Sequence, residues 1–250
     1  MWPEPGQNSL KDVSMDDAAS DLTRKLSRPQ ASAAVADLGW RYVLGGYRAL
    51  ARVPSLARAA EVSTQAVAAC GEAAGQHLRL DVRPDLVALT LQSAAVAGVT
   101  QQDVVLARRI SAALAELGVP TSPEIGPGVT RSVQALEIAI DAMDIAAIRP
   151  FWKAVMGYGD ETDGSAPDDG LIDPLWQGPT IWFQQMDVPR TQRNRIHFDV
   201  SVPHDEAPHR IQATLDAGGV LVSDAEAPAF WLLADAEGNE ACVTTWQGRD

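Results

Sequence analysis

Residues 193–202 read Arg-Asn-Arg-Ile-His-Phe-Asp-Val-Ser-Val, and the interpretation of the whole chain starts from this stretch. Its second half alternates apolar and polar residues, which is typical of a half-buried β-strand. His197, Asp199 and Ser201 share one side of such a strand, so a histidine and a carboxylate face the same way. The spacing leaves two interpretations open: an edge strand with a polar outer face, or the polar wall of a ligand pocket.

The remaining pattern predicts an α+β protein. Two alternating runs around a Gly-Gly pair predict a β-hairpin over residues 40–53. Pro54 favours the start of an alanine-rich helix over residues 54–74, and Thr100 with Asp103 favours the N-terminus of another over residues 100–117. Further helices are expected at 16–26, 31–38, 144–156 and 204–217, and strands at 85–91, 133–140, 180–186, 196–202, 220–222, 230–233 and 240–246.

Negative charge is concentrated in the second half of the chain. The 250 residues carry a formal net charge of −13. Residues 1–130 hold 12 basic and 13 acidic residues (net −1), whereas residues 131–250 hold 8 basic and 20 acidic residues (net −12). Because such a surface repels phosphates and anionic lipids, we expect neither a nucleic acid nor a membrane partner.

The sequence also bears on location and redox state. No apolar run is long enough to span a bilayer, and the N-terminus lacks the features of a signal peptide, so we expect a cytoplasmic protein. The two cysteines, Cys70 and Cys242, are far apart in sequence and form neither a disulfide framework nor a zinc cluster by spacing.

Composition divides the chain into two domains. Residues 120–128 are rich in proline and glycine, which predicts a linker. We expect a flexible N-terminus over residues 1–15, a first domain over 16–118, a linker over 119–130 and a second domain over 131–250. The second domain repeats one unit of strand, helix and further strands, with copies at about 133–187 and 194–246. A duplicated unit of this kind can enclose a cleft.

Four motifs occur in order in the second domain: Ile140-Asp-Ala-Met-Asp144, Phe151-Trp152 with Met156-Gly157, Ile196-His-Phe-Asp-Val-Ser-Val202, and Asp235-Ala-Glu-Gly-Asn-Glu240. Through these motifs, residues 133–246 resemble the vicinal oxygen chelate superfamily of glyoxalases, extradiol dioxygenases and bleomycin-resistance proteins. The nearest branch is the set of glyoxalase-like domains, most of which lack an assigned chemistry. The resemblance implies paired βαβββ modules that form a curved sheet around a cleft.

The resemblance also implies positions for a metal ion. The family's ligands fall on Glu137 and His197 at the module starts, and on Gln184 and Cys242 near the module ends. Gln184 is a weak neutral ligand, and the apolar neighbours of Cys242 favour packing, so Glu240 is the substitute on the same side. Two states of the cleft stay open: a divalent metal held by Glu137, His197 and Glu240, or a metal-free cleft. The residues expected to bind substrate there are Trp182, Gln184, Asp199, Phe230 and Trp231.

Residues 31–118 resemble pterin-4a-carbinolamine dehydratase, which implies an α/β sandwich with an antiparallel sheet and helices on one face. The marks are Gly39-Trp40, the hairpin, the helix that runs into Gln76-His77, and Gly98-Val-Thr-Gln-Gln-Asp-Val-Val-Leu-Ala107. The family's catalytic residues are a His-His pair before proline and a later Thr-His. Here these positions read Gln76-His77-Leu78 and Ser93-Ala94. Dehydration needs both a base and an acid, so we expect the domain to have lost most of its dehydratase activity. His77 is the remaining catalytic candidate, and Gln76 is expected to contact a ligand.

Two functions from different classes compete. In the first, the second domain is an enzyme that uses Glu137 and His197, on a metal or as an acid/base pair, for an isomerisation or lyase-type step on a small oxygenated substrate. In the second, the protein binds or sequesters a small molecule without catalysis, and the first domain serves assembly. Residual dehydratase activity through His77 is a third hypothesis. In each case we expect a small-molecule ligand and a homo-oligomer, a dimer.

Overall fold

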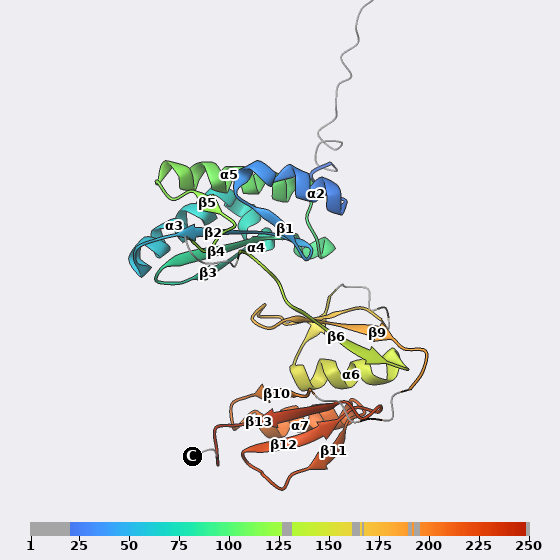
Figure 1. Ribbon diagram of the computed structural model, residues 1–250. Helices are drawn as coiled ribbons and strands as arrows, with labels where there is room; N and C mark the ends of the chain where they lie inside the picture. Colours follow the sequence, from blue (N-terminus) through green and yellow to red (C-terminus); the bar gives the residue numbers. More distant parts are fainter. Residues whose placement is uncertain are drawn as a thin grey trace, which may run out of the picture. The chain divides into compact units, whose positions relative to one another are not determined.

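The computed structural model describes residues 21–126, 132–161, 166, 168–189, 192 and 196–248. The chain splits into two compact units, Met1–Ala135 and Leu136–Asp250, and each is described by itself (Figure 1). Residues 16–20 of the helix expected at 16–26, the expected flexible N-terminus and residues 193–195 lie outside the described residues, and of the remaining part of that helix residues 21–23 are helical. Among those that are described, no helix combines the length and apolar character that crossing a bilayer requires.

The first unit is a five-stranded antiparallel sheet with helices on one face, as the sequence predicts (Figure 1). The strand order is β1-β2-β4-β3, and β5 also pairs with β2. The strands are β1 (Arg41–Val43), β2 (Gly46–Arg52), β3 (Leu78–Val82), β4 (Leu86–Leu91) and β5 (Thr121–Ser122). The helices are α2 (Arg28–Ala34), α3 (Leu56–Cys70), α4 (Ala74–His77) and α5 (Gln101–Glu116), with short 3₁₀ turns at Ala36–Leu38, Gly71–Ala73 and Ala94–Val96.

Two of these strands differ from expectation. β3 follows α4 directly and was not predicted, although Leu78-Arg79-Leu80-Asp81-Val82 alternates in the way that a strand requires. β5 lies inside the segment expected to be a linker, and it extends the sheet edge by pairing with β2. Gly39 explains why this close approach works: its φ is +75°, and a Cβ there would lie 2.2 Å from the Thr121 carbonyl oxygen.

Strand alternation decides which side of this sheet carries the core. Tyr47 and Ala49 of β2 are buried in one core with α3 and α5. The intervening Arg48, Leu50 and Arg52 therefore lie on the sheet face that carries no helix. The capping box that was predicted at the start of α5 is present, since the Thr100 backbone N–H donates to Asp103 Oδ2 at 2.7 Å.

The second unit consists of two βαβββ modules, which confirms the duplication expected from the sequence. The first module contains β6 (Glu137–Ala142), α6 (Ile145–Met156), β7 (Gly159–Asp160), β8 (Leu171–Ile172) and β9 (Thr180–Gln185). The second contains β10 (Phe198–Ser201), α7 (Ala207–Asp216), β11 (Val220–Ser223), β12 (Phe230–Ala234) and β13 (Glu240–Thr244). They form two mixed sheets of identical order, β6-β9-β8-β7 and β10-β13-β12-β11. In each, the first and last strands are parallel and the other pairs are antiparallel.

The helices of both modules share one core with both sheets. Trp152 of α6 connects the modules: its ring centroid lies 5.5 Å from that of Phe198 in β10, and its Nε1 donates to Asp235 Oδ2 at 3.0 Å. Figure 1 shows α6 between the two sets of strands. Because the inner faces of both sheets contact this helical core, their outer faces carry no helix.

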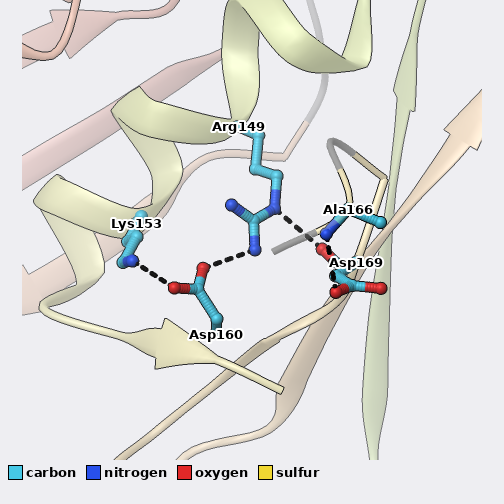
Figure 2. A network of polar contacts seen from close by, with 5 residues as sticks. All are labelled: Arg149, Lys153, Asp160, Ala166 and Asp169. Carbon is cyan, nitrogen blue, oxygen red and sulfur yellow. Dashed lines mark hydrogen bonds and ion pairs between the residues drawn. The ribbon is translucent and has the colours of Figure 1, made fainter. Parts of the chain in front are cut away.

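Polar contacts also hold α6 in place, both within the helix and just before its N-terminus. Within the helix, Arg149 is buried and donates to Asp160 Oδ1 at 2.6 Å and to the Asp169 carbonyl at 2.8 Å, while Lys153 donates to the other Asp160 oxygen (Figure 2). At the N-terminus, the Glu237 carboxylate accepts from the backbone N–H groups of Met143 at 2.9 Å and Asp144 at 2.7 Å. A turn of the second module thus completes the helix start of the first.

Candidate metal and ligand sites

Three side chains with metal-binding atoms lie together on the outer sheet face of the second module. The ligand atoms of His197, Asp199 and Cys242 all lie within 4.8 Å of one another. His197 Nε2 is 3.5 Å from Asp199 Oδ1, and about half of each of these two side chains is exposed. Cys242 is buried. Imidazole, carboxylate and thiolate together form a donor set that suits zinc, and three protein ligands leave a fourth position open.

Strand pairing explains this convergence. β10 and β13 are parallel, with Asp199 opposite Cys242 and Ser201 opposite Thr244. The Ser201 and Thr244 hydroxyl oxygens are 2.8 Å apart, which places both pairs on one face. His197 precedes β10 and keeps the side that the alternation of the sequence predicts. Cys242 was interpreted as a packing residue, because its neighbours are apolar and the register with β10 is not visible in the sequence.

The other predicted ligands lie elsewhere. Glu137 starts β6 in the first module and is exposed. Gln184 lies on β9 opposite Asp141, also in the first module. Glu240 starts β13, two residues before Cys242, but it does not belong to the group of three. Within the described residues, the structure therefore brings His197 together with Asp199 and Cys242 and leaves Glu137 apart.

A cleft of about 700 Å³ lies between the edge strands of the two modules. Its apolar lining includes Ile138, Met143, Trp152, Met186, Ile196 and Phe198, and its polar lining includes Asp141, Gln192, Glu237, Asn239 and Glu240. Glu240 connects the cleft to the group of three, because it lines the cleft and lies two residues before Cys242 on the same side of β13. The sequence analysis missed Trp152 and Glu237 here: Trp152 carries only a core signal, and Glu237 sits in a turn.

The aromatic residues predicted for the cleft occupy other positions. Trp182 lies on the outer face of the first module and is 39% exposed. Phe230 pairs with Thr244, which places it on the outer face of the second module. Trp231 alternates to the inner face and packs against the shared core. None of these three side chains lines the cleft.

His77 in the first unit has a buried partner. Its Nδ1 lies 2.8 Å from Asp103 Oδ1, and Asp103 is completely buried. The second Asp103 oxygen accepts from the Thr100 backbone N–H and hydroxyl, so both carboxylate oxygens have hydrogen-bond partners. Burial, and then the charge of Asp103, raise the pKa of the Tyr47 phenol. Gln76 and Ala94, at the positions of the other two family histidines, are exposed.

Family models match both units. Residues 137–244 match a glyoxalase-like domain, and residues 24–113 match pterin 4 alpha carbinolamine dehydratase. None of the curated proteins compared with the chain matches it.

Solved structures resemble each unit separately. A glyoxalase/bleomycin resistance protein/dioxygenase family enzyme from Burkholderia phytofirmans PsJN is 18% identical over 44% of this chain and 95% of its own, with a TM-score of 0.36. The fosfomycin resistance protein FosX from Listeria monocytogenes, in a mutant complexed with Mn(II) and 1S,2S-dihydroxypropylphosphonic acid, is 11% identical over 45% and 90%, with a TM-score of 0.35. A transcriptional coactivator/pterin dehydratase from Brucella melitensis is 22% identical over 36% and 98%, with a TM-score of 0.33. By the family models, the chain joins a domain similar to pterin 4 alpha carbinolamine dehydratase, at residues 24–113, to a glyoxalase-like domain at residues 137–244.

Proposed function

We propose that the glyoxalase-like domain binds a divalent metal ion through His197, Asp199 and Cys242 and holds a small oxygenated molecule in the adjoining cleft. The convergence of these three donor atoms is the observation that carries the proposal. Ligand atoms around a tetrahedral zinc ion lie roughly 3.3–3.8 Å apart, for bonds of about 2.0–2.3 Å. The observed limit of 4.8 Å is close to this spacing, so small side-chain movements close the site.

The reaction class that fits this arrangement is an isomerisation or a lyase-type step. A bound divalent ion supplies Lewis acidity, which stabilises negative charge on a substrate oxygen. Glu240 lines the cleft two residues from Cys242, and its carboxylate is the group that would take a proton from the bound molecule and return it. Trp152 and Phe198 cover the apolar part of the molecule.

The competing function is binding or sequestration without catalysis. The cleft supports it as well, since its volume and its mixed lining suit a small organic ligand whether or not a metal is present. Absence of a bound metal would separate the two functions, because the catalytic proposal requires an ion at His197 and sequestration does not.

The test is a metal titration of the full chain after chelator treatment, followed by elemental analysis. We expect about one zinc ion per chain, and a loss of affinity of at least about tenfold in His197→Ala and Cys242→Ser. Glu137→Gln and His204→Ala are matched controls in the same domain and should bind metal as the parent does. Equal affinity in all four variants, or no retained metal in the parent, would reject the metal site and leave sequestration.

We further infer a homodimer. The first-module face that carries Glu137 and Trp182 can meet the same face of a second copy, which is the self-complementary contact of a twofold dimer. A third of the Trp182 side chain or more is exposed there, which such a contact would cover. Analytical ultracentrifugation should give a dimer that Trp182→Asp weakens, whereas a monomeric parent would refute this arrangement.

A further inference from the structure

The helix-free face of the first unit carries a row of arginines. Arg41 of β1 pairs with Arg48 of β2, Arg48 pairs with Thr90 of β4, and Thr90 pairs with Arg79 of β3. Residues paired across strands point to the same side, so three guanidinium groups and one hydroxyl form a line across four strands. Adjacent like charges are unfavourable in a sheet, and this chain has an overall charge of −13.

The three arginines differ in their hydrogen-bond partners. Arg41 Nη1 donates to the backbone carbonyls of Trp40 at 2.7 Å and Ala36 at 3.3 Å. Arg79 Nη2 donates to Gln92 Oε1 at 2.7 Å. Arg48 has neither a hydrogen bond nor an ion pair with any described residue, and its Nε is buried without a partner. A guanidinium in this state is costly, because its charge is partly desolvated without compensation.

The electrostatics agree with this contact geometry. Burial lowers the pKa of Arg48. Burial, and then the positive charge of Arg48, lower the pKa of Arg79 to about 10. The second cause shows that the two guanidinium groups repel each other across Thr90. Both groups are charged at neutral pH, so a negative ligand between them would relieve the desolvation and the repulsion together.

A cavity adjoins this pair. It has a volume of about 240 Å³, and its polar lining is Arg48, Arg83, Thr90, Ser132 and Gln134. Its apolar wall consists of Leu50, Leu86, Ala88 and Ile125. Arg83 is already paired with Asp81. Arg48 is therefore the cation that remains for an oxyanion among the described lining residues, with Thr90, Ser132 and Gln134 as neutral polar groups beside it, and the wall accommodates a short apolar body.

We propose that this cavity binds a small organic oxyanion, a phosphate monoester or a carboxylate, with Arg48 as its principal contact. Arginine provides two parallel N–H donors that match the oxygens of phosphate or carboxylate. The site lies on the opposite face of the sheet from His77 and Asp103, and it does not depend on the function proposed for the glyoxalase-like domain. The small net charge of residues 1–130 favours a small anion over a polyanion.

Calorimetric titration of the full chain with inorganic phosphate and, separately, with benzoate tests the proposal at constant ionic strength. We expect saturable binding of at least one probe, and the stronger of the two identifies the anion class. Arg48→Gln should weaken binding at least tenfold, and Arg48→Lys should weaken it several-fold because an ammonium lacks the paired donors. Arg108→Gln removes the same charge from an exposed position on α5 and should leave the affinity within twofold.

A stability measurement separates a ligand site from a structural arginine. Arg48→Met removes an uncompensated charge and keeps an apolar stem, so it should raise the melting temperature without ligand while abolishing the stabilisation by phosphate or benzoate. A lower melting temperature in Arg48→Met would mean that Arg48 serves the fold. Equal binding by the parent and Arg48→Gln, or no saturable binding by the parent, would also overturn the proposal.

Discussion

The two modules of the glyoxalase-like domain share one strand order but differ in what their side chains do. The first module holds the buried residues of α6 and the Arg149 network. The second module buries only Ala207 and Thr214 of α7 but collects His197, Asp199 and Cys242 on its outer face. Equivalent positions at the strand starts therefore carry different chemistry. The two modules have the same strand order, so their residue types decide which of them stabilises the domain and which can bind a ligand.

Truncation of buried tryptophan should give the largest difference between the modules. Trp152→Ala should destabilise the domain by about 3–5 kcal/mol, because it opens a cavity and leaves the Asp235 carboxylate without its indole donor. Trp231→Ala in the second module is the matched change, and we expect about 1–3 kcal/mol since that ring is only partly buried. Urea unfolding monitored by circular dichroism measures both. Equal losses would mean that the modules contribute equally to the core.

Neutralisation of the first-module network should have an intermediate, pH-dependent effect. Hydrogen bonds from Lys153 and then Arg149 lower the pKa of Asp160. A lowered folded-state pKa contributes stability that is present above the unfolded-state value, near 3.9, and lost as the pH falls through the folded-state value. Asp160→Asn should therefore cost about 1–3 kcal/mol at pH 7 and less below pH 4, because it leaves Arg149 without its carboxylate partner.

Thermal unfolding from pH 7 to pH 2.5 measures this dependence. The exposed Asp168→Asn is the matched control, since it removes a carboxylate near the network without an Arg149 contact. If the stability difference between the parent and Asp160→Asn stayed constant down to pH 2.5, the network would not titrate as described.

The smallest effect is expected in the dehydratase-like domain, where Gln76 and Ala94 occupy the positions of two of the family's three histidines. Gln76 and Ala94 cannot exchange protons near pH 7, so we expect no dehydration of a pterin carbinolamine above the uncatalysed rate, and no change in His77→Ala. A stopped-flow assay of both proteins measures this. Turnover of about 1–1000 per second that disappears in His77→Ala would show that the His77–Asp103 pair is sufficient.

Much of the fold was readable from the sequence because long periodic segments carry their own signal. Examples are the β1–β2 hairpin, α5 with its Thr100–Asp103 cap, and both modules. The two-residue strands β7 and β8 are too short to show any period, so neither was among the strands predicted from the sequence. β5 was missed for a different reason, since its composition is that of a linker and only its pairing with β2 makes it a strand.

The candidate sites were less readable because they depend on register between distant strands. The common side of His197 and Asp199 follows from alternation within one strand. The approach of Cys242 requires the parallel pairing of β10 with β13, and the contact of His77 with Asp103 joins residues 26 positions apart. The arginine row likewise appears only once β1, β2, β4 and β3 are aligned.

The hydrogen bonds from the start of α6 to the Glu237 carboxylate have a consequence for biosynthesis. Its carboxylate binds backbone groups of Met143 and Asp144 that lie 94 and 93 residues earlier in the chain. A ribosome that adds about 5–20 residues per second makes the first module several seconds before Glu237 exists. During that interval α6 has only its own cap, the Asp144 side chain, while the N–H groups of Met143 and Asp144 lack the Glu237 acceptor and Trp152 lacks both Phe198 and Asp235. The nascent first module therefore depends on its late-made partner, and the two modules are expected to fold as one unit once the second has been synthesised.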